Sequence, residues 1–123
     1  MSLFTLGTMR ALGSVDQMHT VLQAAVLAGI NHLETAPAYG PAEEFLGQAL
    51  KREGRQPDDG WVITSKLLPG LSLSEGKHQL LKILERLGCS QLDNLAIHGL
   101  NRPEHLDWAL QGDGKDLLDW AQG

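Results

Sequence analysis

The sequence contains a single cysteine, Cys89, among its 123 residues. One cysteine cannot form an intramolecular disulfide or build a thiolate metal cluster, so we expect a small, partly buried thiol. Positive charge is also scarce, because 10 Lys and Arg stand against 15 Asp and Glu, for a net charge of -5. Since nucleic-acid binding requires a basic patch, this balance argues against a nucleic-acid partner.

Long apolar runs are missing as well. No segment approaches the ~18 apolar residues of a membrane-spanning helix, and the N-terminus lacks the charged and apolar regions of a signal peptide. We therefore predict a cytoplasmic protein with no membrane partner. The apolar fraction of 42% and the charged fraction of 20% are normal for a soluble globular protein, which is long enough here for one domain.

Several motifs of phosphate and metal binding are absent too. There is no Gly-x-Gly-x-x-Gly and no Walker-type Gly-Lys-Ser/Thr, which excludes dinucleotide and phosphate loops of those kinds. His32 and Glu34 form the His-x-Glu pattern of zinc deaminases, but the Cys-x-x-Cys partner is missing. His98 and His105 are seven residues apart across a Pro-containing loop, which is not a recognised metal-ligand spacing. We predict no metal site.

What the sequence does contain is a regular alternation of strand-like and helical segments. Short apolar or β-branched runs at residues 3–6, 30–35, 61–64 and 92–97 are predicted strands. A polar loop is predicted between Gly54 and Gly60. The order β-α-β-α-β-α-β-α predicts an α/β fold whose parallel sheet has right-handed crossovers.

Capping signals mark where the helices begin. Ser14 and Ser72 each start a capping-box pattern, and Pro41 and Pro103 suit the first turns of two further helices. Glu43 and its neighbour Glu44 would complement the positive end of the second helix. The predicted apolar stripes consist of Met18, Val21, Leu22, Ala25 and Val26; of Ala42, Phe45, Leu46, Ala49 and Leu50; and of Leu80, Leu81, Leu84 and Leu87. A short helix containing Leu106 and Leu110 and a last helical segment carrying Leu117, Leu118 and Trp120 are also predicted.

Four polar side chains follow predicted strands. Glu34, Lys66 and His98 each lie at the end of a strand, and Tyr39 lies in the loop after one. All C-termini of parallel strands lie at one edge, where (β/α) folds have their active sites. Each residue alone has a plain structural explanation, such as helix capping or solvation, but their joint occurrence at one edge favours a proton-transfer site.

These residues also resemble a known family. Residues 34–43 read Glu-Thr-Ala-Pro-Ala-Tyr-Gly-Pro-Ala-Glu, which is similar to the aldo-keto reductase signature Asp-Thr-Ala-x-x-Tyr-Gly-x-x-Glu. Residues 64–66 resemble the strand-end lysine of that family, and residues 95–99 resemble its strand-end histidine. Residues 6–9 resemble its first strand and cofactor-facing loop. The resemblance covers nearly the whole chain in order.

The resemblance implies an NADP-dependent reductase of small carbonyl substrates, aldehydes or ketones. Reduced nicotinamide would give a hydride to the carbonyl carbon, and Tyr39 would donate a proton to the carbonyl oxygen. Lys66 would favour the phenolate form of Tyr39. Glu34 would hold Lys66, and His98 would orient the substrate carbonyl and share the proton.

One position departs from the family pattern, because Glu34 stands where the family has Asp. The extra methylene moves the carboxylate by about one bond length, and catalytic positioning is sensitive to ~1 Å. Two alternatives follow: Glu34 pairs with Lys66, or it pushes Lys66 aside. The resemblance also implies that Thr8, Met9 and Glu34 contact the cofactor.

The resemblance further implies a (β/α)8 TIM barrel, which needs ~250 residues. Residues 1–123 would form its N-terminal half as one domain of about four β/α units. The family holds NADPH mainly through its second half, so the main binding residues would be absent from this chain. We expect little turnover from the isolated chain.

An alternative is a non-enzymatic function. In a half-barrel the first and fourth strands are open edges, whose unpaired backbone groups invite pairing with another chain. The chain would then be a non-catalytic interaction or assembly module that self-associates through these edges. This hypothesis predicts a stable oligomer and no cofactor binding.

Overall fold

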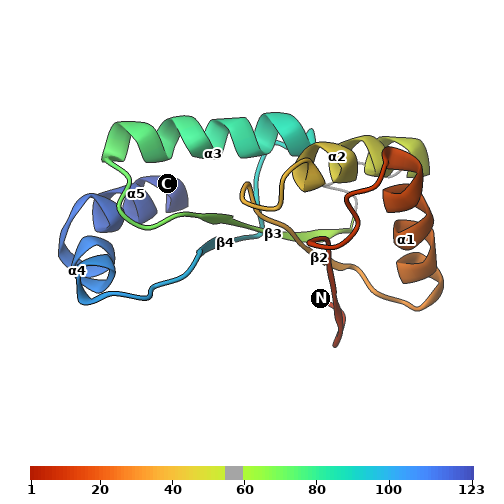
Figure 1. Cartoon of the computed structure of the whole chain (residues 1–123), viewed down its shortest axis with the longest axis horizontal. Coiled ribbons are helices and arrows are strands. Elements are labelled where there is room, and N and C mark those ends of the chain that lie inside the picture. The colour runs from red at the N-terminus through yellow and green to blue at the C-terminus, as the bar shows by residue number, and fades with distance from the viewer. Residues whose placement is uncertain (55–59) are drawn as a thin grey trace.

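The computed structural model describes residues 1–54 and 60–123 (Figure 1). The predicted loop at residues 54–60 lies almost entirely outside these described residues. Strands and helices alternate along the chain as predicted, up to a final pair of helices. The elements are β1 (Thr5–Gly7), α1 (Val15–Leu27), β2 (His32–Glu34), α2 (Ala42–Glu53), β3 (Val62–Leu67), α3 (Leu73–Leu87), β4 (Asn94–Ile97), α4 (Pro103–Gln111) and α5 (Asp113–Gln122).

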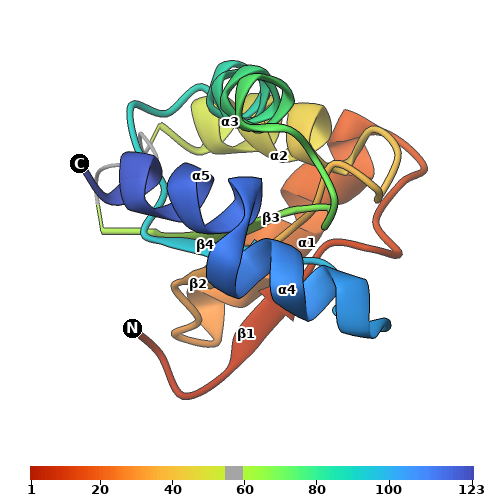
Figure 2. The same ribbon diagram turned by 90° about the vertical axis from the view of Figure 1, so that its left-hand side faces the viewer.

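The four strands form one parallel sheet in the order β1-β2-β3-β4, so each strand pairs with the strand that precedes it in the chain. Leu6, Leu33 and Ile63 stand in register across the first three strands. Helices α2 and α3 cover the same side of the sheet in both views (Figures 1 and 2). The fold is an open α/β half-barrel, which confirms the predicted fold class.

The two faces of the sheet have opposite chemical character, because successive strand residues point to opposite sides. The face beneath the helices is apolar, and Leu33, Ile63 and Leu67 are buried there. Fully buried side chains of the helices complete this core: Met18, Leu22, Leu46, Leu50, Ile83, Leu87 and Leu117.

The other face carries a hydrogen-bonded polar row that crosses all four strands. His32 bridges two hydroxyls, with Nδ1 2.8 Å from Thr5 Oγ1 and Nε2 2.7 Å from Thr64 Oγ1. Asn94 Nδ2 donates to the same Thr64 oxygen at 3.2 Å. In a closed (β/α)8 barrel this face is the interior, where bulky branched side chains usually dominate. The sequence analysis did not predict this row.

The capping predictions differ in outcome between the two helices. At α3 the box is complete, because Glu75 N–H donates to Ser72 Oγ at 3.1 Å and Ser72 N–H donates to Glu75 Oε2 at 2.9 Å. At α1 the Ser14 hydroxyl accepts from Gln17 N–H at 3.0 Å. The Gln17 side chain, however, accepts from the N–H of Gly13 at 2.7 Å, so only half of the second box forms.

The stripe predicted for α3 needs one correction. Leu81 is 58% exposed, whereas Ile83 is fully buried. The buried positions of this helix are Gly76, Leu80, Ile83 and Leu87, at steps of four, three and four. Leu81 lies about 100° around the helix from Leu80, which carries it to the solvent side.

Strand boundaries also differ slightly from the predicted ones. β3 continues to Leu67, so Lys66 lies inside the strand and not beyond its end. β1 starts at Thr5, which leaves Leu3 and Phe4 before the strand, 100% and 73% exposed.

Among residues 1–54 and 60–123, no helix is long and apolar enough to cross a membrane.

Candidate active site

The structure brings the four predicted site residues together at one edge of the sheet. Glu34 is the last residue of β2, Lys66 lies near the end of β3, and His98 directly follows β4. Tyr39 lies in the short connection between β2 and α2, which is closed by a hydrogen bond of 3.1 Å from its N–H to the carbonyl of Ala36. Parallel strands thus place all four side chains at their common C-terminal end.

Three of these side chains form a closed hydrogen-bonded triangle. The O–H of Tyr39 donates to Glu34 Oε1 at 2.9 Å, and Lys66 Nζ donates to the Tyr39 oxygen at 3.0 Å. Lys66 also forms an ion pair with the same Glu34 oxygen. Of the two alternatives for Glu34, the structure therefore has the one in which its carboxylate pairs with Lys66.

Lys66 has a mostly buried environment. Its ammonium also donates to the carbonyl of Thr35 at 3.2 Å and lies 4.7 Å from the centroid of the Tyr39 ring. Burial lowers the pKa of Lys66 below its ordinary value of 10.5, because desolvation disfavours the charged form. The ammonium lies directly beside the Glu34 carboxylate.

His98 packs against the phenol ring. The two ring centroids are 5.7 Å apart and the ring planes meet at 83°, an edge-to-face contact. The backbone N–H of His98 donates to the carbonyl of Leu67 at 2.8 Å, which continues the sheet by one residue. Within the described part of the chain, His98 Nδ1 and the hydroxyl of Thr35 are buried without a hydrogen-bond partner.

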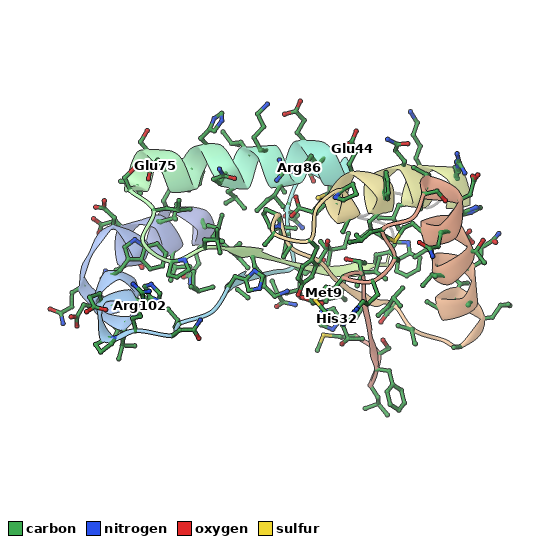
Figure 3. All side chains as sticks on the ribbon, viewed as in Figure 1. Met9, His32, Glu44, Glu75, Arg86 and Arg102 are labelled. Atoms are coloured by element: carbon green, nitrogen blue, oxygen red, sulfur yellow. The ribbon has the colours of Figure 1, made fainter. Side chains whose placement is uncertain are left out.

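Thr8 and Met9, which follow β1, have different environments. Thr8 is fully buried, and both its N–H and its hydroxyl donate to the carbonyl of Glu34 at 3.1 Å. Its side chain therefore fixes the end of β2. Met9 is 49% exposed and lies on the opposite side of the strands from Glu44 and Arg86 (Figure 3).

A small hollow of about 80 Å³ adjoins the site. Lys66 and His98 form its polar wall. The remaining lining is mostly aliphatic and comes from the loops after β2 and β3: Pro37, Ala38, Leu67, Leu68 and Leu71, with Gln79. A larger hollow, of about 690 Å³, lies away from this chemistry, along β4 between α3 and α5.

Sequence reasoning missed the environment of Glu43. This side chain does not complement a helix end in solvent but is 1% exposed and bonded to Ser65 and Arg86. The available signal was its position, because Glu43 lies three residues before the buried Leu46 and next to the buried Ala42 on α2. The residues 1–54 and 60–123 contain no group of three or more His, Cys, Asp or Glu that could hold a metal ion.

A family model described as Aldo/keto reductase family matches residues 4–111. No curated protein matches the sequence. The fold resembles a Pseudomonas aeruginosa protein assigned to the aldo-keto reductases, with 27% identity, a TM-score of 0.80 and coverage of 96% of this chain and 49% of the other.

Two further solved structures share the fold at lower identity. An aldo-keto reductase from a Medee basin deep-sea metagenome library has 23% identity and a TM-score of 0.78, with coverage of 99% of this chain and 42% of the other. The holo form of an aldo-keto reductase from Bacillus halodurans has 22% identity and a TM-score of 0.68, with coverage of 89% and 42%. The chain thus spans about half the length, or less, of these structures.

Proposed function

The chain belongs to the aldo/keto reductase family, and we propose that it is the N-terminal, proton-transfer half of an NADP-dependent reductase of aldehydes or ketones. The observation that carries this proposal is the triangle of Tyr39, Lys66 and Glu34 beside His98. A phenol with a cation at 3.0 Å is suited to giving up a proton and stabilising the anion that remains.

Each side chain has a defined role in this proposal. Tyr39 donates a proton to the carbonyl oxygen of the substrate, and Lys66 stabilises the phenolate. His98 orients the carbonyl through its ring, which packs edge-to-face against that of Tyr39. Reduced nicotinamide, when bound, supplies the hydride that the carbonyl carbon accepts, so that hydride and proton together convert the carbonyl to an alcohol.

The residues present fit one end of such a cofactor. Glu34 uses Oε1 for Tyr39 and Lys66, which leaves Oε2 to accept from a ribose hydroxyl. The exposed Met9 provides an apolar contact. Thr8 would act indirectly, by holding Glu34 in place, since both its hydroxyl and its N–H donate to the Glu34 carbonyl. Phosphate binding would fall to the second half of the barrel, as the resemblance to the family implies.

The test is NADPH oxidation with a panel of aldehydes and ketones. It should use the longer reductase that the proposal implies, in which β/α units continue after residue 123. We expect Tyr39→Phe to abolish turnover, because the ring remains and only the proton donor is removed. Glu44→Gln is a matched control on the exposed side of α2. Retained turnover in the Tyr39→Phe variant would refute the assigned proton donor.

The open sheet edges favour a second candidate function, the assembly module. β1 and β4 are the outer strands of the sheet in the described residues, and Leu3 and Phe4 are exposed beside β1. A hollow of about 690 Å³ lies along β4. Pairing β1 of one copy with β4 of a second copy, at both contacts, would close an eight-stranded parallel barrel and cover both edges.

The assembly module makes two predictions for the 123-residue chain. The assembly module is a dimer in size-exclusion chromatography with light scattering, and it does not bind NADPH in calorimetry. A folded monomer would exclude the dimer. Tight NADPH binding by the 123-residue chain would exclude an assembly module that binds no cofactor.

A further inference from the structure

Glu43 is a buried carboxylate with one partner for each oxygen. Its Oε1 accepts from the Ser65 hydroxyl at 2.6 Å, and its Oε2 accepts from Arg86 Nε at 2.7 Å. Glu43 is 1% exposed and Ser65 is fully buried. A carboxylate in such a place is costly unless it is both paired and hydrogen-bonded, and here both conditions are met.

The side chains of Glu43, Ser65 and Arg86 connect three elements of the fold. Glu43 lies in the first turn of α2, Ser65 in the middle of β3 and Arg86 in the last turn of α3. Gly47, one turn after Glu43, lets α2 approach α3 closely, because a Cβ at this position would collide with the carbonyl oxygen of Arg86. Figure 3 shows Arg86 and the neighbouring Glu44 on the helical side of the sheet.

Two of the three residues, Ser65 and Glu43, lie close in the chain to site residues. Ser65 precedes Lys66 on β3, and the two side chains point to opposite faces of the sheet. Glu43 follows Tyr39 by four residues, and the intervening turn is closed by a hydrogen bond of 3.2 Å from Ala42 N–H to the carbonyl of Tyr39. The Glu43–Ser65 bond therefore ties the segment that carries Tyr39 to the strand that carries Lys66.

We infer that Glu43 is a positioning residue, which fixes the separation between the Tyr39 oxygen and Lys66 Nζ through its bonds to Ser65 and Arg86. It touches none of the groups of the triangle and acts only through the backbone of α2 and β3. Its importance for turnover rests on the proposed reductase function. Its effect on the placement of Tyr39 does not.

The test uses the only tyrosine of the sequence as a probe. Incorporation of 3-fluorotyrosine into the 123-residue chain gives one fluorine resonance, whose chemical shift reports the surroundings of Tyr39. Ser65→Ala removes one hydroxyl and leaves the Glu43–Arg86 ion pair in place. Glu43→Gln keeps the side-chain shape and removes the charge. We expect both variants to move the resonance.

Two control variants separate positioning from general stability. Glu44→Gln changes an exposed acid next to Glu43, and Leu117→Ala weakens the core at α5, remote from Tyr39 along the chain. Both should leave the resonance in place. Urea unfolding identifies which variants are folded, and if Glu43→Gln does not fold, Ser65→Ala decides alone. An unmoved resonance in folded Ser65→Ala would overturn the inference.

The consequence for turnover is measured separately, in the longer reductase. There Ser65→Ala should lower kcat roughly 10- to 100-fold with little change in KM, because a misplacement of ~1 Å can cost about 10²-fold. If the parent enzyme reduces no carbonyl compound, the proposed function fails while the fluorine measurement still decides the inference. If the parent is active and Ser65→Ala retains full kcat, the positioning role is wrong.

Discussion

Tyr39 donates its phenolic O–H to the carboxylate of Glu34 across 2.9 Å. The proton that the proposed reaction would transfer is therefore held by an internal acceptor. A substrate oxygen has to compete with Glu34 for it. Because Glu34 also pairs with Lys66, its carboxylate contacts both the phenol and the ammonium of the site.

Glu34→Asp should raise kcat in the longer reductase. The shorter side chain withdraws the carboxylate by ~1 Å, which weakens its hold on the Tyr39 proton while an acid remains available to Lys66. We expect an increase of about tenfold in kcat and little change in KM, measured as NADPH oxidation with a saturating aldehyde. A fall in kcat would instead show that turnover requires the longer side chain of Glu34.

Lys66 should make stability depend on alkaline pH. Burial lowers its pKa in the folded chain below 10.5, so between the lowered value and 10.5 the unfolded chain binds more protons than the folded chain. The free energy of unfolding that depends on Lys66 therefore rises as pH rises through this window.

Urea unfolding of the parent and of Lys66→Met measures this effect from neutral pH to about pH 10. The stability difference between them should shift in favour of the parent as pH increases. Lys51→Met, at an exposed position of α2, is the control and should show no such trend. A pH-independent difference between parent and Lys66→Met would contradict the prediction.

His98→Phe should separate stability from activity. Phenylalanine keeps an aromatic ring for the edge-to-face contact with Tyr39 and removes the buried, unpartnered Nδ1. Removing such a group is worth about 1 kcal/mol, so the free energy of unfolding should rise by this amount in urea titrations. Turnover in the longer reductase should be lost. A less stable variant would indicate that the imidazole has a partner in solution.

Gly47→Ala should loosen the contact between α2 and α3. The added methyl group collides with the carbonyl oxygen of Arg86, which belongs to rigid backbone. Overpacking of this kind costs roughly 1–3 kcal/mol of unfolding free energy. Gln48→Ala, at the exposed neighbouring position, is the control and should stay within about 0.5 kcal/mol of the parent in urea titrations. Equal stability of both variants would show that the helices can separate without cost.

The sequence predicted where the four polar side chains meet better than it predicted their surroundings. Glu34, Lys66 and His98 could be placed together because parallel strands end at one edge, which needs only the order of the elements. The position of the Glu34 carboxylate could not be predicted, since one methylene decides whether it reaches Lys66. Whether the carboxylate reaches Lys66 depends on side-chain torsion angles, which the sequence pattern does not specify.

Contacts across the sheet and between helices were missed for a related reason. Glu43 looked like a helix-start acid because its partners, Ser65 and Arg86, are 22 and 43 residues away in the chain. The row formed by Thr5, His32, Thr64 and Asn94 depends on strand register, and the alternation within one strand does not give that register.

The strand order has a consequence for how this chain reaches its fold. Each strand pairs with the one made just before it, as Leu33 does with Leu6, 27 residues earlier, and Ile63 with Leu33, 30 residues earlier. The entropy cost of closing each such loop is similar, because it grows only slowly with length. A new strand leaving the ribosome therefore finds its neighbour already present, and the sheet can grow in step with synthesis from the N-terminus.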